Sequence, residues 1–187
     1  MALEQEVKLA FDSVEAARQA VTAAGGRLAV APRLLDDRLF DTADQRLRRL
    51  GCAFRIRRDG ASTIVTFKGP AAPGPVKSRE EIETTIAGPE PIEALFAALE
   101  MREWFRGQKY REEYRLDGIL VTVDDTPIGV FVEIEAPPEQ IAKIAARLGR
   151  TPADYGLESY PKLYFDWCEA RGIKSNEMVF GERRDEY

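Results

Sequence analysis

Histidine is absent from this sequence, and cysteine is nearly so. Without imidazole there is no Ser-His or Cys-His nucleophile pair, and the most common general base of enzymes is missing. The two cysteines, Cys52 and Cys168, lie far apart and lack the spacing of zinc ligands. Carboxylates are therefore the plentiful metal ligands that remain, and their oxygen atoms suit Mg²⁺ or Mn²⁺.

Several signals of binding and targeting are missing as well. The sequence has no phosphate-cradling glycine loop, no dinucleotide fingerprint, no signal peptide and no transmembrane run. We therefore expect a cytoplasmic protein with no membrane partner and no organic cofactor. The formal net charge of −5 argues against a nucleic-acid partner, because such proteins usually need a basic excess to displace counterions from phosphates.

Charged residues are abundant, and many recur in pairs one residue apart with an apolar residue between them. Side chains alternate between the faces of a β-strand, so both members of a pair share one face. If helices cover the apolar face, the charged face must line the inside of a closed or strongly curled sheet. The pattern therefore predicts a barrel with a charged bore. The clearest groups are Glu4, Glu6 and Lys8; Arg55 and Arg57; Arg79, Glu81 and Glu83; Lys109 and Arg111; and Glu133 and Glu135.

A strand with one face in water alternates in the same way, and for any single pair that is the simpler interpretation. The whole set favours the bore, because acids and bases segregate along the chain and nearly balance in number. Such a balance lets an enclosed charged channel exist. The candidate acids are Glu4, Glu6, Glu81, Glu83, Asp124, Glu133 and Glu135, and the candidate bases are Lys8, Arg55, Arg57, Lys68, Arg79, Lys109 and Arg111.

The length of 187 residues fits one domain, which we place at residues 1–172, followed by a C-terminal tail at 173–187. Short turns join strand pairs, so we expect an α+β fold with a mainly antiparallel sheet. Alternation predicts about eight strands, at 3–11, 34–40, 52–58, 63–68, 76–86, 108–116, 119–125 and 130–136. Helical spacing predicts a helix with an N-cap box at Asp12 and Glu15 that ends near Gly25, and helices at 91–103, 138–148 and 159–171. The tail is either loosely held or docks through Val179 and Phe180.

The charged groups stand in a series of motifs that starts with Glu4-Gln-Glu6-Val-Lys8 and continues at 37–42, 54–57, 66–70, 78–83, 109–114, 123–124 and 129–135. The first motif resembles the ExExK signature of the CYTH superfamily, the triphosphate tunnel metalloenzymes, and the others are similar to the strand motifs of that family in the same order. The family includes class IV adenylate cyclases, thiamine triphosphatases and inorganic tripolyphosphatases. The resemblance covers residues 3 to about 165 and implies an eight-stranded antiparallel closed β-barrel, a tunnel with helices packed outside.

A triphosphate requires cations around its oxygens and a divalent ion that bridges some of them. Resemblance and charge together assign phosphate contacts to Lys8, Arg55, Arg57, Lys68, Arg79, Lys109 and Arg111. They assign one or two Mg²⁺ or Mn²⁺ ions to Glu4, Glu6, Glu133 and Glu135, with Asp124 nearby and with Glu81 and Glu83 as ligands of a second ion or as partners of arginines. The expected catalytic residues are Glu4, Glu6, Lys8 and Asp124.

The resemblance also places a C-terminal helix against the tunnel mouth, where Lys162 is a candidate substrate contact. The alternative is an ordinary solvated lysine on a helix. Asp37 and Arg38 leave a similar choice, because they either point inward or form a surface salt bridge.

Two reactions fit these residues and differ in the attacking atom. In a phosphohydrolase, water attacks inorganic tripolyphosphate or an organic triphosphate and orthophosphate leaves; in a class IV adenylate cyclase, the ribose 3′-hydroxyl of ATP attacks and pyrophosphate leaves. We favour hydrolysis, because Val123 stands where cyclase-like members often carry a histidine and Leu39 replaces a common tyrosine. A non-catalytic triphosphate or polyphosphate sensor is the third hypothesis, which the retained carboxylates disfavour. The expected partner is a triphosphate-containing small molecule, and the protein is a monomer or homodimer.

Overall fold

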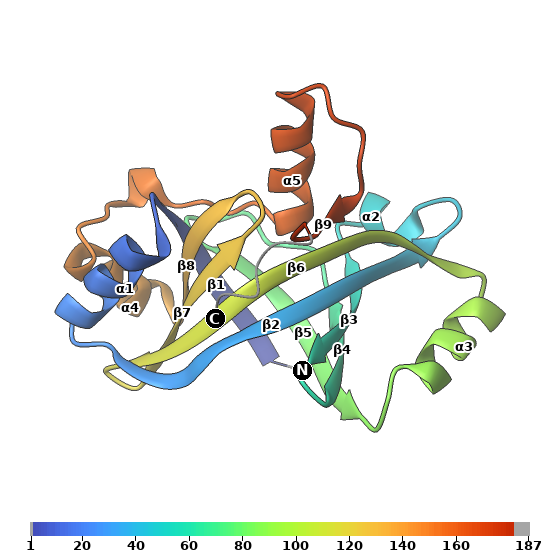
Figure 1. Cartoon of the computed structure of the whole chain (residues 1–187), viewed down its shortest axis with the longest axis horizontal. Coiled ribbons are helices and arrows are strands. Elements are labelled where there is room, and N and C mark those ends of the chain that lie inside the picture. Colours follow the sequence, from blue (N-terminus) through green and yellow to red (C-terminus); the bar gives the residue numbers. More distant parts are fainter. Residues whose placement is uncertain (1, 182–187) are drawn as a thin grey trace.

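The structure is a computed structural model of the chain, and it describes residues 2–181. Within those residues eight strands pair into a closed antiparallel barrel, and a short further strand adds to one of them. The barrel order is β2-β3-β4-β5-β1-β8-β7-β6, and the pairing of β6 with β2 closes it. The predicted α+β fold, an eight-stranded antiparallel closed barrel with helices outside, is confirmed (Figure 1).

The barrel strands differ in length more than the sequence pattern indicates. β2 and β6 have 16 residues each and lie side by side across the molecule (Figure 1). The prediction covered only part of each, because the pairing of these two strands shifts register at three places and interrupts simple alternation. The strands are β1 (Ala2–Phe11), β2 (Arg27–Thr42), β3 (Ala53–Asp59), β4 (Ser62–Lys68), β5 (Lys77–Ile86), β6 (Met101–Leu116), β7 (Ile119–Thr126) and β8 (Gly129–Glu135).

The alternation along β1 explains how charge comes to lie inside the barrel. Glu6 and Lys8 face the cavity, whereas Val7 and Leu9 face outward and are fully buried. Two helices, α1 (Val14–Ala23) and α4 (Pro138–Arg147), supply the apolar residues that cover them. Full burial of a Val or Leu side chain contributes about 1.5–3 kcal/mol. The core between barrel and helices therefore stabilises the fold and leaves the inner face available for charge.

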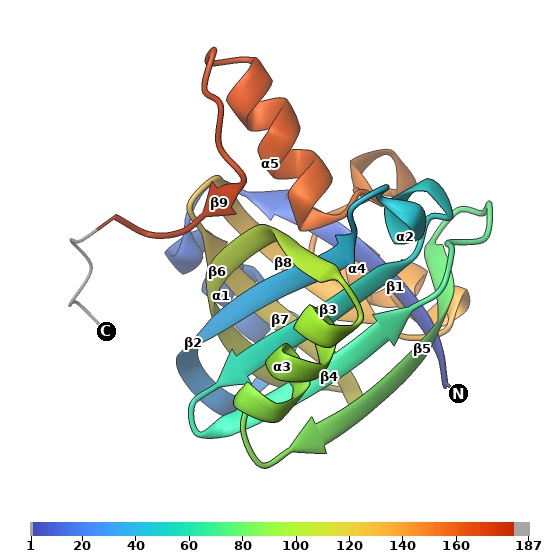
Figure 2. The same ribbon diagram turned by 90° about the vertical axis from the view of Figure 1, so that its right-hand side faces the viewer.

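Two further helices lie elsewhere around the barrel (Figure 2). α3 (Glu90–Ala98) packs Phe96 against Phe40 and Ile56 on the outer face of β2 and β3. α5 (Tyr160–Glu169) stands over one end of the barrel (Figures 1 and 2). The short α2 (Arg46–Arg49) and a 3-10 turn, η1 (Pro152–Asp154), were not predicted. None of the helices in residues 2–181 is both long and apolar enough to cross a bilayer.

The start of the first helix differs from the prediction. Ser13 caps α1, and its Oγ accepts a hydrogen bond from Ala16 N (3.1 Å), so the cap is not at Asp12. Ile82, which alternation assigns to the covered apolar side of its strand, is instead 51 % exposed and borders the cavity. The expected burial of the apolar residues between the charges is thus wrong at Ile82.

The helix predicted at 91–103 is too long. α3 ends at Ala98, and Glu100 adopts a left-handed φ of 57°, which stops a helix. From Met101 onward the chain pairs with β2, so Trp104 and Phe105 belong to β6. The prediction carried the helix into residues 101–103, where tertiary pairing with β2 overrides the local pattern.

Part of the predicted tail returns to the barrel. β9 (Glu177–Met178) pairs in parallel with β6 at Arg106 and Gly107, and Met178 is buried. The Phe180 ring lies 5.2 Å from the Tyr110 ring, measured between centroids. Residues 177–180 thus dock on the barrel, which was one of the two alternatives for the tail. Residues 182–187 of the predicted tail lie outside the described residues.

Candidate functional site

A cavity of about 700 Å³ lies inside the barrel. Its lining carries equal numbers of acidic and basic side chains, so the charged bore expected from the alternation is present. The acids are Glu4, Glu6, Asp37, Asp59, Glu81, Glu83, Glu113, Glu133 and Glu135. The bases are Lys8, Arg33, Arg55, Arg57, Lys68, Lys77, Arg79, Lys109 and Arg111.

Two residues of the predicted site do not belong to this lining. The Lys162 side chain is 61 % exposed and pairs with Asp166 one turn further along α5 (Nζ–Oδ1 2.6 Å). Asp124 is fully buried and lies behind Lys109 and Arg111. The structure brings the other predicted residues together around the cavity: Glu4, Glu6, Lys8, Arg55, Arg57, Lys68, Arg79, Glu81, Glu83, Lys109, Arg111, Glu133 and Glu135.

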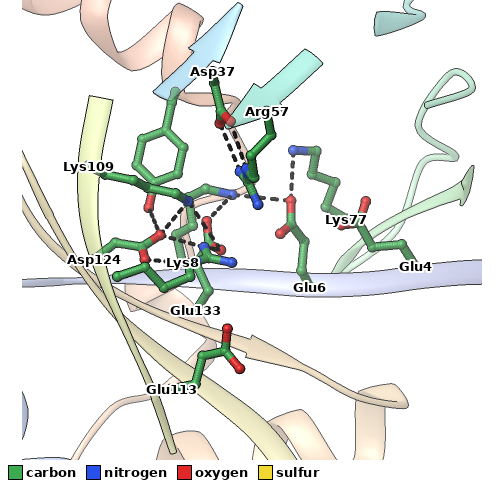
Figure 3. Close-up of polar contacts among 12 residues, drawn as sticks. Glu4, Glu6, Lys8, Asp37, Arg57, Lys77, Lys109, Glu113, Asp124 and Glu133 are labelled. Atoms are coloured by element: carbon green, nitrogen blue, oxygen red, sulfur yellow. Dashed lines mark hydrogen bonds and ion pairs between the residues drawn. The ribbon is translucent and has the colours of Figure 1, made fainter. Parts of the chain in front are cut away.

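Asp124 organises one wall of the cavity (Figure 3). Its Oδ2 accepts hydrogen bonds from Lys109 Nζ (2.6 Å), Arg111 Nη2 (2.6 Å) and the Tyr160 hydroxyl (2.8 Å), and its Oδ1 accepts one from Arg111 Nε (2.6 Å). Burial opposes ionisation, but the charges of Arg111 and Lys109 lower the pKa of Asp124 below its ordinary value. An ionised carboxylate with this many donors is a fixed anchor for the two cations.

Glu6 and Glu133 bind lysines of the cavity lining (Figure 3). Lys8 Nζ lies 3.1 Å from Glu6 Oε1 and 3.2 Å from Glu133 Oε1, and Lys77 Nζ lies 2.9 Å from Glu6 Oε1. Arg111 also contacts Glu133. Burial opposes ionisation of Glu6, but Lys8 and Lys77 hold its pKa well below the ordinary value. Glu6 is therefore a carboxylate at neutral pH.

The basic side chains of the bore also lower the pKa of one another. Burial and the Arg111 guanidinium lower the pKa of Lys109 to about 8, and burial and the Lys8 ammonium lower the pKa of Lys77 to about 8. An anionic ligand would favour the protonated form of both lysines. The bore is thus electrostatically suited to a polyanion.

Asp37 points inward and forms a forked pair with Arg57, with Nε–Oδ1 at 2.7 Å and Nη2–Oδ2 at 2.8 Å (Figure 3). Burial opposes ionisation, yet Arg57 and Arg55 hold the pKa of Asp37 well below its ordinary value. Arg38 points the other way and pairs with Glu93 of α3 (2.8 Å). The sequence left open whether Asp37 and Arg38 point inward or form a surface salt bridge. Asp37 points inward, and Arg38 forms a salt bridge on the outside.

Carboxylates gather at a second part of the cavity. Glu4 bonds to Lys68 Nζ (2.7 Å) and Arg79 Nε (2.8 Å), and Glu81 shares the same lysine (2.6 Å). Glu135 has no hydrogen bond or ion pair to any residue of the described chain. Burial and the charges of Glu4, Glu6 and Glu81 raise the pKa of Glu135 above its ordinary value. Negative charge is therefore in excess around Glu135.

This acidic part has the donor chemistry of a divalent-metal site. Carboxylate oxygens are the ligands that Mg²⁺ and Mn²⁺ prefer, and a divalent cation would relieve the repulsion that raises the pKa of Glu135. Within residues 2–181 no three acidic side chains already form a metal-binding group. The geometry explains this, because the two oxygens of Glu4 are taken by Lys68 and Arg79. The residues fit such an ion once these pairs exchange.

Several cavity residues were missed by the sequence interpretation. Lys77 and Glu113 each lie two positions from a chosen residue, Arg79 and Arg111, so the same alternation would have found them. Arg33 and Asp59 form a forked pair (2.7 and 2.9 Å), and neither stood in a recognised charged group. Tyr160 reaches the cavity from α5 and carries no charge, so no signal used for the sequence pointed to it.

Buried polar atoms without a partner also occur around the cavity. Among the described residues they include Arg33 Nη1, Arg55 Nε and Thr122 Oγ1, all from side chains that belong to the lining. Buried polar atoms without a hydrogen-bond partner lower the stability of the folded protein. Together with the clustered bases, they equip the bore to hold a ligand rich in anionic oxygens.

Comparisons with known proteins agree with this geometry. A family model described as the CYTH domain matches residues 2–150. A protein of Methanocaldococcus jannaschii named "putative adenylate cyclase" is 30 % identical over 134 residues, which cover 71 % of this chain and 76 % of that protein.

Solved structures with similar folds include a "putative adenylate cyclase" of Vibrio parahaemolyticus, with a TM-score of 0.76 and 17 % identity over 87 % of this chain and 98 % of that chain. Another is a "putative adenylyl cyclase" of Hippeastrum, described as revealing a dominant triphosphatase activity. It has a TM-score of 0.65 and 20 % identity over 92 % of this chain and 97 % of that chain. At these identities the likeness concerns the fold.

Proposed function

The chain belongs to the CYTH domain family, and on that premise we propose that it is a divalent-metal-dependent phosphohydrolase that cleaves a triphosphate bound inside the barrel. The observation that carries the proposal is the convergence of arginines and lysines from several strands on one cavity inside the barrel that also holds carboxylates. A triphosphate needs that combination, with cations for its oxygens and carboxylates for its metal.

The phosphate chain exchanges partners with the ion pairs of the bore. Arg55, Arg57 and Arg111 offer forked contacts to phosphate oxygens, and Lys8 and Lys109 offer point charges. Lys68 and Arg79 extend this set toward the acidic part of the cavity. Asp124 does not line the cavity, and its proposed role is to orient Lys109 and Arg111.

Glu4, Glu6, Glu133 and Glu135 would hold the first divalent ion, and Glu81 and Glu83 are the proposed ligands of a second. When bound, Mg²⁺ or Mn²⁺ neutralises charge on the phosphate oxygens and lowers the pKa of a coordinated water. Glu135 is the ligand that needs no prior exchange, because it has no ion pair within the described residues.

In the proposed reaction a water oxygen forms a bond to the terminal phosphorus as the bond from that phosphorus to its bridging oxygen breaks. Orthophosphate and the shortened phosphate chain are the products, and the proton of the water passes to a carboxylate of the acidic part. Arg57, fixed by Asp37, and Lys109, fixed by Asp124, hold the phosphate chain in line during this step.

The second candidate is adenylate cyclase activity, which the name of the Methanocaldococcus jannaschii relative favours. In that reaction the ribose 3′-hydroxyl of ATP attacks the α-phosphorus and pyrophosphate leaves. The Hippeastrum structure, described with a dominant triphosphatase activity, carries a cyclase name as well, so such a name does not decide against hydrolysis. A sensor that binds without turnover is the third candidate.

One assay separates the candidates. Purified protein is incubated with tripolyphosphate, ATP and thiamine triphosphate, with Mg²⁺, with Mn²⁺ or with excess EDTA, and the products are resolved by phosphorus NMR. We expect orthophosphate that depends on the metal and disappears with EDTA. Pyrophosphate with cyclic AMP would replace the proposal with cyclase activity, and tight binding without turnover would replace it with a sensor.

Two variants make the assay specific to the cavity. Glu6→Gln removes a proposed metal ligand without a change of size, and we expect turnover to fall at least about a hundredfold. Lys162→Ala removes an exposed lysine whose pair with Asp166 lies in solvent, and we expect activity within about twofold of the wild type. Full activity of Glu6→Gln would remove Glu6 from the site.

A further inference from the structure

The first turn of α5 presents Tyr160 to the cavity. Ser159, Tyr160 and Pro161 belong to the cavity lining, whereas Lys162 is exposed and pairs along the helix with Asp166. The helix is capped by Ser159, whose Oγ accepts a hydrogen bond from Lys162 N (3.4 Å). The orientation of α5 thus brings a tyrosine, and not the nearby lysine, against the charged wall.

The hydroxyl of Tyr160 bonds to the anchor of that wall. It donates to Asp124 Oδ2 (2.8 Å), the same oxygen that accepts from Lys109 Nζ (2.6 Å) and Arg111 Nη2 (2.6 Å). Burial and the Asp124 carboxylate raise the pKa of Tyr160 well above its ordinary value, so the phenol keeps the proton that it donates. Tyr160 therefore adds a contact from α5 to a carboxylate that the two cations of β6 also bind.

The ring of Tyr160 contacts two lysines of the bore. Its centroid lies 4.5 Å from Lys109 Nζ and 5.2 Å from Lys8 Nζ, within the range of a cation–π interaction. The Tyr160 ring also packs in a T-shaped arrangement against Phe131 of β8, with centroids 5.6 Å apart. One side chain of α5 thus contacts ammonium groups from β1 and β6 at the same time.

α5 is attached to the barrel by several contacts besides this hydroxyl. Tyr164 and Cys168 of the same helix are buried in a cluster with Phe105 and Met178, and the Tyr164 hydroxyl donates to Glu177 O (2.8 Å). The chain before the helix is also bonded to the barrel, because the backbone of Gly156 exchanges two hydrogen bonds with that of Lys8 (2.9 and 2.8 Å). The contacts of Tyr160 are thus additional to those that dock the helix.

We propose that Tyr160 is a positioning residue of the triphosphate reaction, which acts by holding Asp124, Lys109 and Lys8 in the arrangement that grips the phosphate chain. The inference rests on the proposed function and adds to it a residue outside the barrel strands. It also gives α5 a role in binding that is independent of Lys162.

The test compares two hydroxyl deletions on the same helix. Tyr160→Phe removes the bond to Asp124 and keeps the ring over the lysines, and Tyr164→Phe removes the bond to the Glu177 backbone. For Tyr160→Phe we expect the KM for tripolyphosphate to rise about tenfold, as for the loss of one hydrogen bond to a charged group, with little change in Tm. For Tyr164→Phe we expect a lower Tm and an unchanged KM. Tyr160→Leu, which also removes the ring, should raise the KM further than Tyr160→Phe.

The inference is overturned if the KM of Tyr160→Phe stays within about twofold of the wild-type value, or if Tyr164→Phe raises it as much, since the effect would then be one of helix docking. Calorimetric titration with tripolyphosphate keeps this test separate from that of hydrolysis. If the wild type binds without turnover, the hydrolase proposal fails and the same comparison is made on Kd. If the wild type binds no triphosphate, both proposals fail.

Discussion

Every carboxylate of the cavity lining except Glu135 has a lysine or arginine partner among the described residues. Most of these pairs are buried or half-buried, and their mutual attraction offsets part of the cost of burying charge. In the proposed function a triphosphate and a divalent cation bring opposite charges into the same space. Cations that Asp37 and Asp124 do not fix can then move from a carboxylate to a phosphate, and the metal takes the released carboxylate. At the residue scale the site is thus set up for an exchange of ionic partners.

The low pKa of two bore lysines predicts a pH dependence. Lys109 and Lys77 have a pKa of about 8 in the folded protein, below the ordinary value of a lysine, so both lose their charge as the pH rises through about 8. We expect kcat/KM for tripolyphosphate, which reports the free enzyme, to fall through the same range. A pH series of initial rates from 6 to about 10 measures it.

Unfolding does not explain such a fall. A lysine whose pKa is lower in the folded than in the unfolded protein favours the folded state more as the pH rises above about 8. These two lysines therefore work against unfolding in the range where activity declines, and Tm measured at each pH is the control. A flat activity profile up to pH 9.5 or so would contradict the lowered pKa values.

At the scale of elements, the turn after β2 depends on one buried side chain. Asp41 is 2 % exposed, and its carboxylate accepts hydrogen bonds from three backbone N–H groups: Thr42 (2.8 Å), Leu47 (2.9 Å) and Arg48 (3.0 Å). Four residues are too few for an independently stable helix. The carboxylate therefore replaces the partners that the first N–H groups of α2 lack.

Asp41→Ala leaves these N–H groups unpaired, and we expect a loss of about 1–3 kcal/mol in the free energy of unfolding. Asp44→Ala is the matched control, because Asp44 lies in the same turn but is exposed and pairs with Arg49 at the surface. Urea unfolding measures both. Equal midpoints for the two variants would show that the buried bonds of Asp41 do not stabilise the turn.

At the scale of the whole molecule, closure of the barrel is what turns alternating strands into a site. The pairing of β2 with β6 joins the two ends of the sheet, so the inner faces of all strands in that ring meet around one cavity. An open sheet would leave the same charges in solvent, where ion pairs contribute little to the free energy of folding. Closure thus provides the enclosure that makes Lys8, Glu6 and Glu133 a buried group.

The sequence predicted the closed barrel and most of the bore because alternation is a property of the strand itself. Glu6 and Lys8 must share a face whatever their neighbours are. Alternation also held the information for Lys77 and Glu113, which extend groups already chosen. The prediction could go this far because each of these residues sits in a regular strand.

Other features depend on tertiary contacts that leave no local pattern. Asp124 shares the inward side of its strand, yet only the crowding of Lys109, Arg111 and Tyr160 places it behind the lining. The start of β6 at Met101 depends on pairing with β2, and the approach of Tyr160 depends on how α5 docks. No single stretch of sequence encodes these arrangements.

The most direct test of the central claim is anomalous diffraction from crystals of the protein with Mn²⁺ and tripolyphosphate. We predict a manganese peak at Glu4, Glu6 and Glu135, and phosphate density that contacts Arg57 and Lys109 inside the barrel. Phosphate and manganese bound only on the outer surface, with the ion pairs of the bore unchanged, would contradict the account.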